Sequence, residues 1–268
     1  MNQILEFLNG EMNRPLPYQS LEEGWFHYLA LVLVVVGSVI SVSRMKQMSD
    51  AKLKKTLLIF AGVLILFEIY KQLIFSYQAN WSYQWYAFPF QFCSTPMYVA
   101  LLAGLTKNKK VFEALKIFLA TFGLFAGLAV MLYPMTVFVS TIGINIQTMV
   151  HHGGMAIIGL GILVNQIKLE SKSIFKASLV FSVLVLIALV MNTIHNTWIQ
   201  IGTFNMFFIN PRFENGLPIL GLFQPLVPAP IFLLIYIFGF SLCAYIMLFI
   251  GILTKHFNQR KEVSFQKA

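Results

Sequence analysis

Seven runs of mostly apolar residues, separated by short polar breaks, dominate this chain of 268 residues. A helix needs about 20 apolar residues to cross the hydrocarbon core of a bilayer, which is close to the length of these runs. Only 11% of the residues are charged, so the chain cannot cover its apolar surface in water. We therefore expect an all-α, polytopic membrane protein, a bundle of seven transmembrane helices. The runs cover residues 25–42, 56–75, 88–105, 111–133, 148–166, 175–201 and 226–253.

The basic residues fall on alternate breaks between these runs, and this explains the net charge of +9. Sixteen of the 19 Lys and Arg residues lie in or close to the first, third and fifth breaks or in the tail. By the positive-inside rule, those breaks are cytoplasmic. We expect an extracellular N-terminal segment 1–24, a transmembrane domain 25–253 and a cytoplasmic tail 254–268. Because the charge serves topology, no nucleic-acid partner is expected.

Polar and ionisable side chains inside a membrane are costly and are therefore functional candidates. Glu68 and Lys71 lie near the outer end of the second run, three residues apart and on one helix face. They are either an internal ion pair or part of a site. His151 and His152 open the fifth run. Adjacent helical residues point about 100 degrees apart, so we expect one histidine to face a site and the other to meet a loop or lipid headgroups.

Other polar side chains fall at the same outer level. In the third run, Pro96 follows Cys93 closely and can kink the helix and free a carbonyl beside the cysteine. The convergence of several helices on one layer predicts a polar pocket in the extracellular half of the bundle. Its expected binding residues are Gln91, Glu68, Lys71, Asn192, His195, Asn205 and Arg212.

The residue types in this layer suit acyl transfer, which needs a nucleophile, a base and donors for the developing oxyanion. Cys93 would be the nucleophile, and His152 or His151 the base. A backbone amide at the start of a helix, Gln91 or Asn192 would donate to the oxyanion. Phospholipid esters are the acyl source that a membrane offers.

Two other classes stay open at this point. A zinc hydrolase would use the three outer histidines with Glu68 and Cys93, but adjacent histidines seldom chelate one ion from a helix and no HxxxH pair occurs, so no metal or other cofactor is expected. A non-enzymatic carrier or receptor would use Glu68, Lys71 and Arg212 to hold a small solute or a lipid headgroup.

Three sequence motifs together resemble the bacterial YwaF-type integral membrane family, over roughly residues 60–250. They are Phe88-Pro-Phe-Gln-Phe-Cys93, His151-His152-Gly153, and Phe204-Asn-Met-Phe-Phe-Ile-Asn-Pro211 before the last run. That family is distantly similar to vertebrate membrane acyl hydrolases and acyltransferases, including the androgen-dependent protein that regulates tissue factor pathway inhibitor.

The resemblance implies a seven-helix protein of the bacterial plasma membrane that acts on acyl esters with a nucleophilic side chain and a histidine. Carried to this chain, it points to Cys93 and His152, with Asn205 in a structural outer-loop motif. Membrane lipids, and a small-molecule or acyl-lipid substrate, are then the expected partners.

Overall fold

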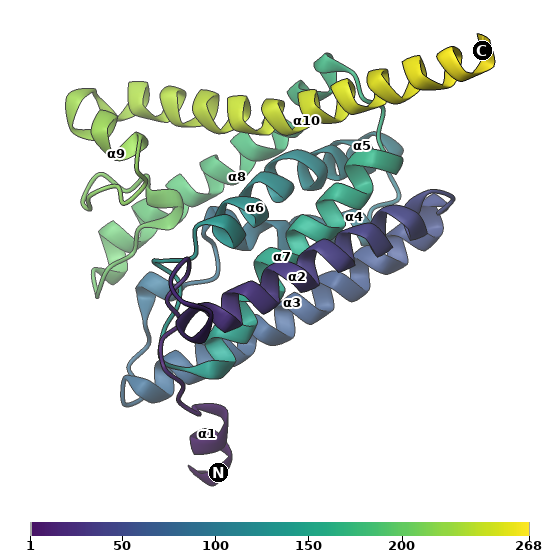
Figure 1. Ribbon diagram of the computed structural model, residues 1–268. Coiled ribbons are helices and arrows are strands. Elements are labelled where there is room, and N and C mark those ends of the chain that lie inside the picture. The colour runs from purple at the N-terminus through teal and green to yellow at the C-terminus, as the bar shows by residue number, and fades with distance from the viewer. Residues whose placement is uncertain (1, 268) are drawn as a thin grey trace.

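A computed structural model describes the backbone of residues 2–267 and the side chains of residues 3–256. In that part of the chain every named element of secondary structure is a helix (Figure 1). A π-helical turn, Leu119–Gly123, joins the helix that ends at Phe118 to the helix that begins at Leu124. A second π-helical turn, His195–Ile199, extends the helix that ends at Ile194. The α-helices are α1 (Asn2–Leu8), α2 (Leu21–Met45), α3 (Asp50–Gln78), α4 (Thr95–Leu105), α5 (Lys109–Phe118), α6 (Leu124–Leu132), α7 (Ile142–Asn165), α8 (Ile174–Ile194), α9 (Leu220–Phe223) and α10 (Ala229–Lys267).

Six helical stretches in the described residues are long and apolar enough to cross a membrane, and the third expected span is the exception. It is helical only over Phe92–Leu105. Pro96 lies in the first turn of α4, where a missing N–H costs little because the first donors of a helix have no intrahelical partner. The proline therefore begins the helix and does not kink it. We expected residues 88–91 to belong to this helix, but they are not helical. Seven complete crossings remain a prediction.

Helix α7 lies at the centre of the bundle and contacts α2, α3 and α6. A pair of glycines allows two of these approaches. A Cβ on Gly153 would lie 2.7 Å from the Val34 side chain of α2, and a Cβ on Gly154 would lie 2.8 Å from the Phe60 ring of α3. Most of α7 and of the continuous α5–α6 helix is buried, whereas α2, α3, α8 and α10 present most of their residues outward.

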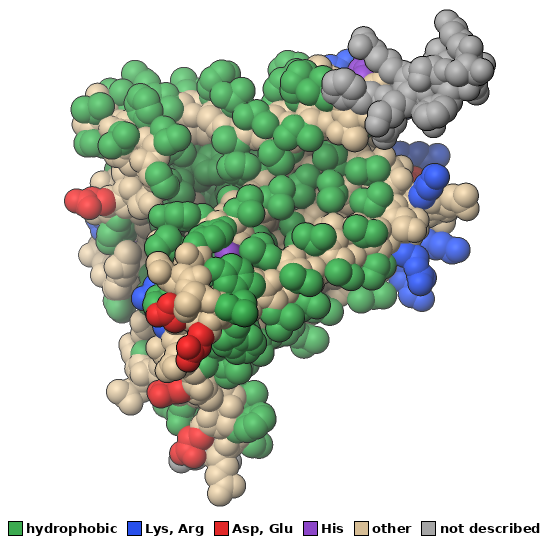
Figure 2. Space-filling view, in the orientation of Figure 1, with side chains coloured by type: hydrophobic (Ala, Val, Ile, Leu, Met, Phe, Trp, Pro, Cys, Tyr) green, Lys and Arg blue, Asp and Glu red, His purple; other side chains and the backbone are tan. Residues whose placement is uncertain are grey.

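Charge separates along the length of the bundle. Figure 2 shows Lys and Arg side chains gathered at one end of a broad apolar band and most Asp and Glu side chains toward the other end. This is the distribution that a membrane-spanning bundle requires, because the apolar band faces lipid. The expected tail residues Arg260, Lys261 and Lys267 lie outside the described side chains. The exposed basic residues in or beside the first, third and fifth breaks are Arg44, Lys46, Lys52, Lys55, Lys107, Lys109, Lys110, Lys168, Lys172 and Lys176.

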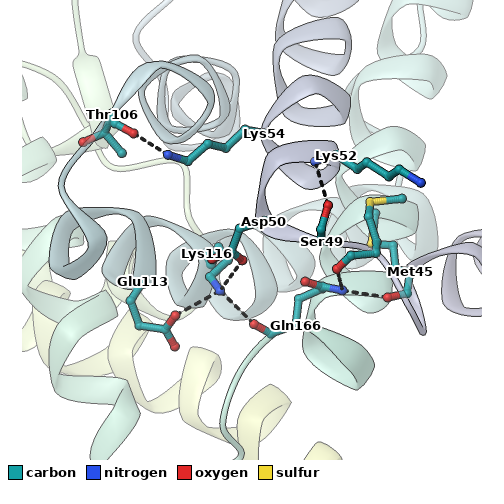
Figure 3. Close-up of polar contacts among 10 residues, drawn as sticks. Met45, Ser49, Asp50, Lys52, Lys54, Thr106, Glu113, Lys116 and Gln166 are labelled. Atoms are coloured by element: carbon teal, nitrogen blue, oxygen red, sulfur yellow. Dashed lines mark hydrogen bonds and ion pairs between the residues drawn. The ribbon is translucent and has the colours of Figure 1, made fainter.

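One buried lysine ties the basic end together (Figure 3). The Lys116 ammonium of α5 lies 3.0 Å from the Glu113 carboxylate and 3.7 Å from that of Asp50 at the start of α3. It also donates to the Gln166 carbonyl oxygen after α7, at 3.0 Å. The Gln166 side chain donates in turn to the Met45 carbonyl oxygen at the end of α2. Four helices are thereby held by one connected polar cluster.

We expect Lys116→Met to lower stability by about 1–3 kcal/mol, because it leaves a buried carbonyl and two carboxylates without their donor. The measurement is the thermal midpoint of the purified protein in detergent. Lys52→Met is the matched control, since the Lys52 side chain points away from the cluster and is exposed (Figure 3). Equal midpoints for the two variants would contradict the role of the cluster.

The orientation, with the N-terminus outside and the C-terminus inside, is a prediction that cysteine labelling of intact cells tests. An impermeant maleimide should label Ser82→Cys, in the loop after α3, and should leave Lys109→Cys, at the start of α5, unlabelled until the cells are opened. The labelling of the unmodified protein is subtracted from that of each variant, which corrects for the two native cysteines. The reverse pattern would invert the topology.

Candidate functional site

Cys93 lies in a single 3-10 turn, Phe92–Ser94, that leads into α4. Its side chain is half-buried and forms no disulfide. Its carbonyl oxygen accepts a hydrogen bond from Nε2 of His151, at 2.9 Å. The sequence predicts a carbonyl freed beside Cys93 by a kink at Pro96. In the structure the helix has no such kink, and the carbonyl of Cys93 itself bonds to a histidine of α7.

Both histidines of α7 are buried, at 3% and 7% exposure for His151 and His152. The expectation that one of them meets a loop or lipid headgroups is therefore wrong. His152 turns back on its own helix, where its Nδ1 donates to the Thr148 carbonyl oxygen at 2.8 Å. In each ring the other nitrogen, Nδ1 of His151 and Nε2 of His152, is buried and has no hydrogen-bond partner. Each ring therefore keeps one free lone pair.

Glu68 and Lys71 form the ion pair that their spacing predicts, with 2.9 Å between the ammonium and Oε1. Gln72 donates to the same oxygen at 2.7 Å, whereas Oε2 of Glu68 is buried without a partner. The Glu68 carboxylate thus receives both of its donors on one oxygen and keeps the other oxygen free.

Two of the expected binding residues bond to a buried loop segment, residues 204–210. The Gln91 side chain accepts from the Phe207 N–H at 2.9 Å and donates to the Asn205 carbonyl oxygen at 3.0 Å. The Asn192 side chain of α8 accepts from the Met206 N–H at 2.9 Å and donates to the Met206 carbonyl oxygen at 3.0 Å. These amides give the N–H groups of Met206 and Phe207 acceptors in irregular backbone at this depth, and they add a second donor to the carbonyls of Asn205 and Met206.

The remaining expected residues also support the fold. The Asn205 side chain accepts from the Asn210 N–H at 2.9 Å, in keeping with a structural role. His195 donates to the Ile201 carbonyl oxygen, and its ring stacks on that of Phe204. The Arg212 side chain is exposed and is not brought to Cys93. The polar layer is thus largely filled by loop backbone and is not the open polar pocket that we expected.

A narrow apolar crevice lies between α3, α4, the Leu119–Gly123 turn and α7. Pro96, on its wall, follows Cys93 by three residues, and Met155 lies one helical turn beyond His151. The lining is entirely apolar. The lining residues are Phe60, Pro96, Leu119, Gly123, Met155, Ile158 and Gly159.

The described side chains contain no group of three His, Cys, Asp or Glu residues close enough to share a metal ion. His195 belongs to the aromatic cluster of Trp85 and Phe204, away from the Cys93–His151 contact. The zinc ligands considered from the sequence are therefore not assembled in this part of the chain.

Comparison with known families gives one match, a model described as the TMEM164 family, over residues 22–253. The chain belongs to the TMEM164 family. The match covers every long apolar helix that the structure shows. No curated protein and no solved structure matches the chain.

Membership in the TMEM164 family, together with six apolar helices, identifies a multi-pass membrane protein. The narrower resemblance to YwaF-type proteins and the bacterial plasma membrane remain predictions. The chemistry of this TMEM164-family protein must therefore be argued from the site.

One buried polar group of this TMEM164-family protein was missed in the sequence. Tyr236 of α10 is completely buried, and its hydroxyl has no hydrogen-bond partner. The rule that singled out Glu68, a polar side chain within an apolar span, would have found it. Tyrosine was overlooked because most of its surface is apolar.

We expect Asn192→Ala to destabilise the TMEM164-family bundle by about 1–3 kcal/mol, because it leaves the N–H of Met206 unpaired in a buried segment and leaves its carbonyl with only the long bond from the Ile209 N–H, at 3.4 Å. Thermal unfolding in detergent measures the loss. Thr197→Ala is the control, since that exposed hydroxyl bonds only to the Thr193 carbonyl of its own helix. A midpoint for Asn192→Ala equal to that of the control would show that the segment does not depend on this side chain.

Proposed function

We propose that this protein is a membrane-embedded lipid acyl hydrolase or acyltransferase in which Cys93 is the nucleophile and His151 the base. The observation that carries the proposal is the hydrogen bond between His151 and the Cys93 peptide, inside the bundle. Nucleophilic acyl transfer needs a base within reach of the nucleophile, and this bond holds the His151 ring of α7 against the backbone of the residue that carries the thiol.

His151 is favoured over His152 because it contacts the nucleophile's own residue. With Nε2 donating to the Cys93 carbonyl, the lone pair of the His151 ring is on Nδ1, which has no other partner. The ring must turn, or exchange its proton between nitrogens, to bring a lone pair to the thiol. Catalytic hydrogen bonds are often formed only when substrate is bound, so this adjustment is ordinary.

A lipid ester is the substrate class that the surroundings favour. The crevice next to Pro96 is lined by apolar side chains, and the outside of the bundle presents an apolar band to lipid. In the proposed reaction, the thiolate attacks the ester carbonyl, the lysolipid leaves with a proton from the histidine, and a thioester forms on Cys93. Water or the hydroxyl of a second lipid then accepts the acyl group and frees the thiol.

The first test incubates purified protein with isotopically labelled phospholipids and follows the products by mass spectrometry. We expect labelled fatty acid or transacylated lipid with the unmodified protein and neither with Cys93→Ala, because the nucleophile is removed. Cys243→Ala, which removes the other free thiol, is the control and should keep full turnover. Turnover that survives Cys93→Ala would refute the proposal.

The second test separates the two histidines. We expect His151→Gln to reduce turnover by roughly 10²–10⁴-fold, the usual contribution of a general base. His152→Gln, its neighbour on the same helix, should have a much smaller effect. A larger loss for His152→Gln would transfer the base to that residue.

A further inference from the structure

Tyr236 is surrounded by aromatic rings, in a place where phenylalanine would pack equally well. Its ring lies 4.8 Å from that of Phe240 and 6.1 Å from that of Phe232, and it stacks parallel to that of Phe181 at 6.0 Å. The hydroxyl is fully buried without a partner. Buried tyrosine hydroxyls usually have a partner, because leaving one unpaired lowers stability. Packing therefore explains the ring of Tyr236 and leaves the hydroxyl unexplained.

The same aromatic cluster reaches the nucleophile. Phe92, the residue before Cys93, lies 4.7 Å from Phe240 and 5.3 Å from Phe181, ring to ring. Phe240 and Phe181 therefore link the Tyr236 ring to the residue directly before Cys93. Helix α10, which carries Tyr236, and helix α3, which carries the Glu68–Lys71 pair, lie in different layers of the bundle (Figure 1).

The two side chains expected from the sequence as oxyanion donors already donate to other groups. The side-chain amides of Gln91 and Asn192 hold the backbone of the 204–210 segment. Lys71 is paired with Glu68. Tyr236, in contrast, offers a hydroxyl proton with no other acceptor, in an apolar setting where a hydrogen bond to a developing charge is strong.

We propose that the Tyr236 hydroxyl is the oxyanion donor of this site, an inference that rests on the acyl-transfer function proposed above. As the Cys93 sulfur bonds to the ester carbonyl carbon, the π electron pair moves to the carbonyl oxygen, and the Tyr236 O–H donates to that oxygen. When the carbonyl re-forms, the ester C–O bond breaks and the leaving alkoxide takes the proton that the histidine removed from the thiol. Tyr236 keeps its own proton throughout.

The experiment compares two reactions of the same thiol, in the Cys243→Ala background so that Cys93 is the single free cysteine. Acylation by p-nitrophenyl octanoate in detergent passes through an oxyanion and is followed by nitrophenolate release. Alkylation by iodoacetamide displaces iodide and forms no oxyanion. We expect Tyr236→Phe to slow acylation by about 10²–10³-fold, the usual effect of removing one oxyanion donor, and to leave alkylation unchanged.

The thermal midpoint of unfolding gives a third readout, and its expected change in Tyr236→Phe has a definite direction. Because the hydroxyl is unpaired in the resting protein, Tyr236→Phe should not lower the midpoint. Tyr245→Phe, which removes a phenol from the same helix near Ser171, is the matched control and should change none of the three measurements.

Each outcome separates this inference from the proposed function. If Cys93→Ala still releases nitrophenolate at the full rate, the proposed function fails. If Cys93→Ala is inactive but Tyr236→Phe acylates normally, the nucleophile stands and the oxyanion role of Tyr236 is refuted. A parallel loss of acylation and alkylation would also refute it, since it would show that Tyr236 maintains the reactivity of the thiol or the fold.

Discussion

The half of this bundle that lies opposite its basic end depends on pairing irregular backbone with side-chain amides. Hydrocarbon offers no hydrogen bonds, so each buried N–H and carbonyl needs a partner within the protein. In the 204–210 segment, Gln91 and Asn192 each bond to both a donor and an acceptor of the backbone. Phe207 and Phe208 have positive φ angles of 59° and 56°, which non-glycine residues adopt at a cost and which the surrounding contacts must hold.

That pairing has consequences for the candidate site. The segment bonds to Gln91, directly before the Phe92–Ser94 turn, and α4 begins only after that turn. Cys93 is therefore carried on a short turn, with its carbonyl available to His151. The Phe207 ring packs against that of Phe92 and links the segment to the turn that carries Cys93. Fold and site share one set of contacts here.

The sequence predicts the coarse architecture well, because apolar run length and basic-residue spacing are the dominant constraints in a membrane. It also predicts the Glu68–Lys71 pair, since i to i+3 spacing alone sets that contact. It does not predict that Gln91 and Asn192 face backbone, because a polar side chain near a membrane surface suits a ligand and a loop equally. The burial of both His151 and His152 depends on α7 being enclosed on several sides, which periodicity within one helix does not reveal.

The short third helix also sets how far a lipid must travel. From Leu105 at its basic end to Cys93 is about 18 Å along the axis at 1.5 Å per residue, whereas the hydrocarbon core of a bilayer is about 30 Å thick. Ester groups belong to the polar boundary of the membrane, so the thiol lies below the level at which they normally reside. Under the proposed function, a phospholipid would have to sink toward the midplane to react here, or the protein would have to thin the bilayer around α4. Bilayer thickness would then control access to the Cys93 thiol.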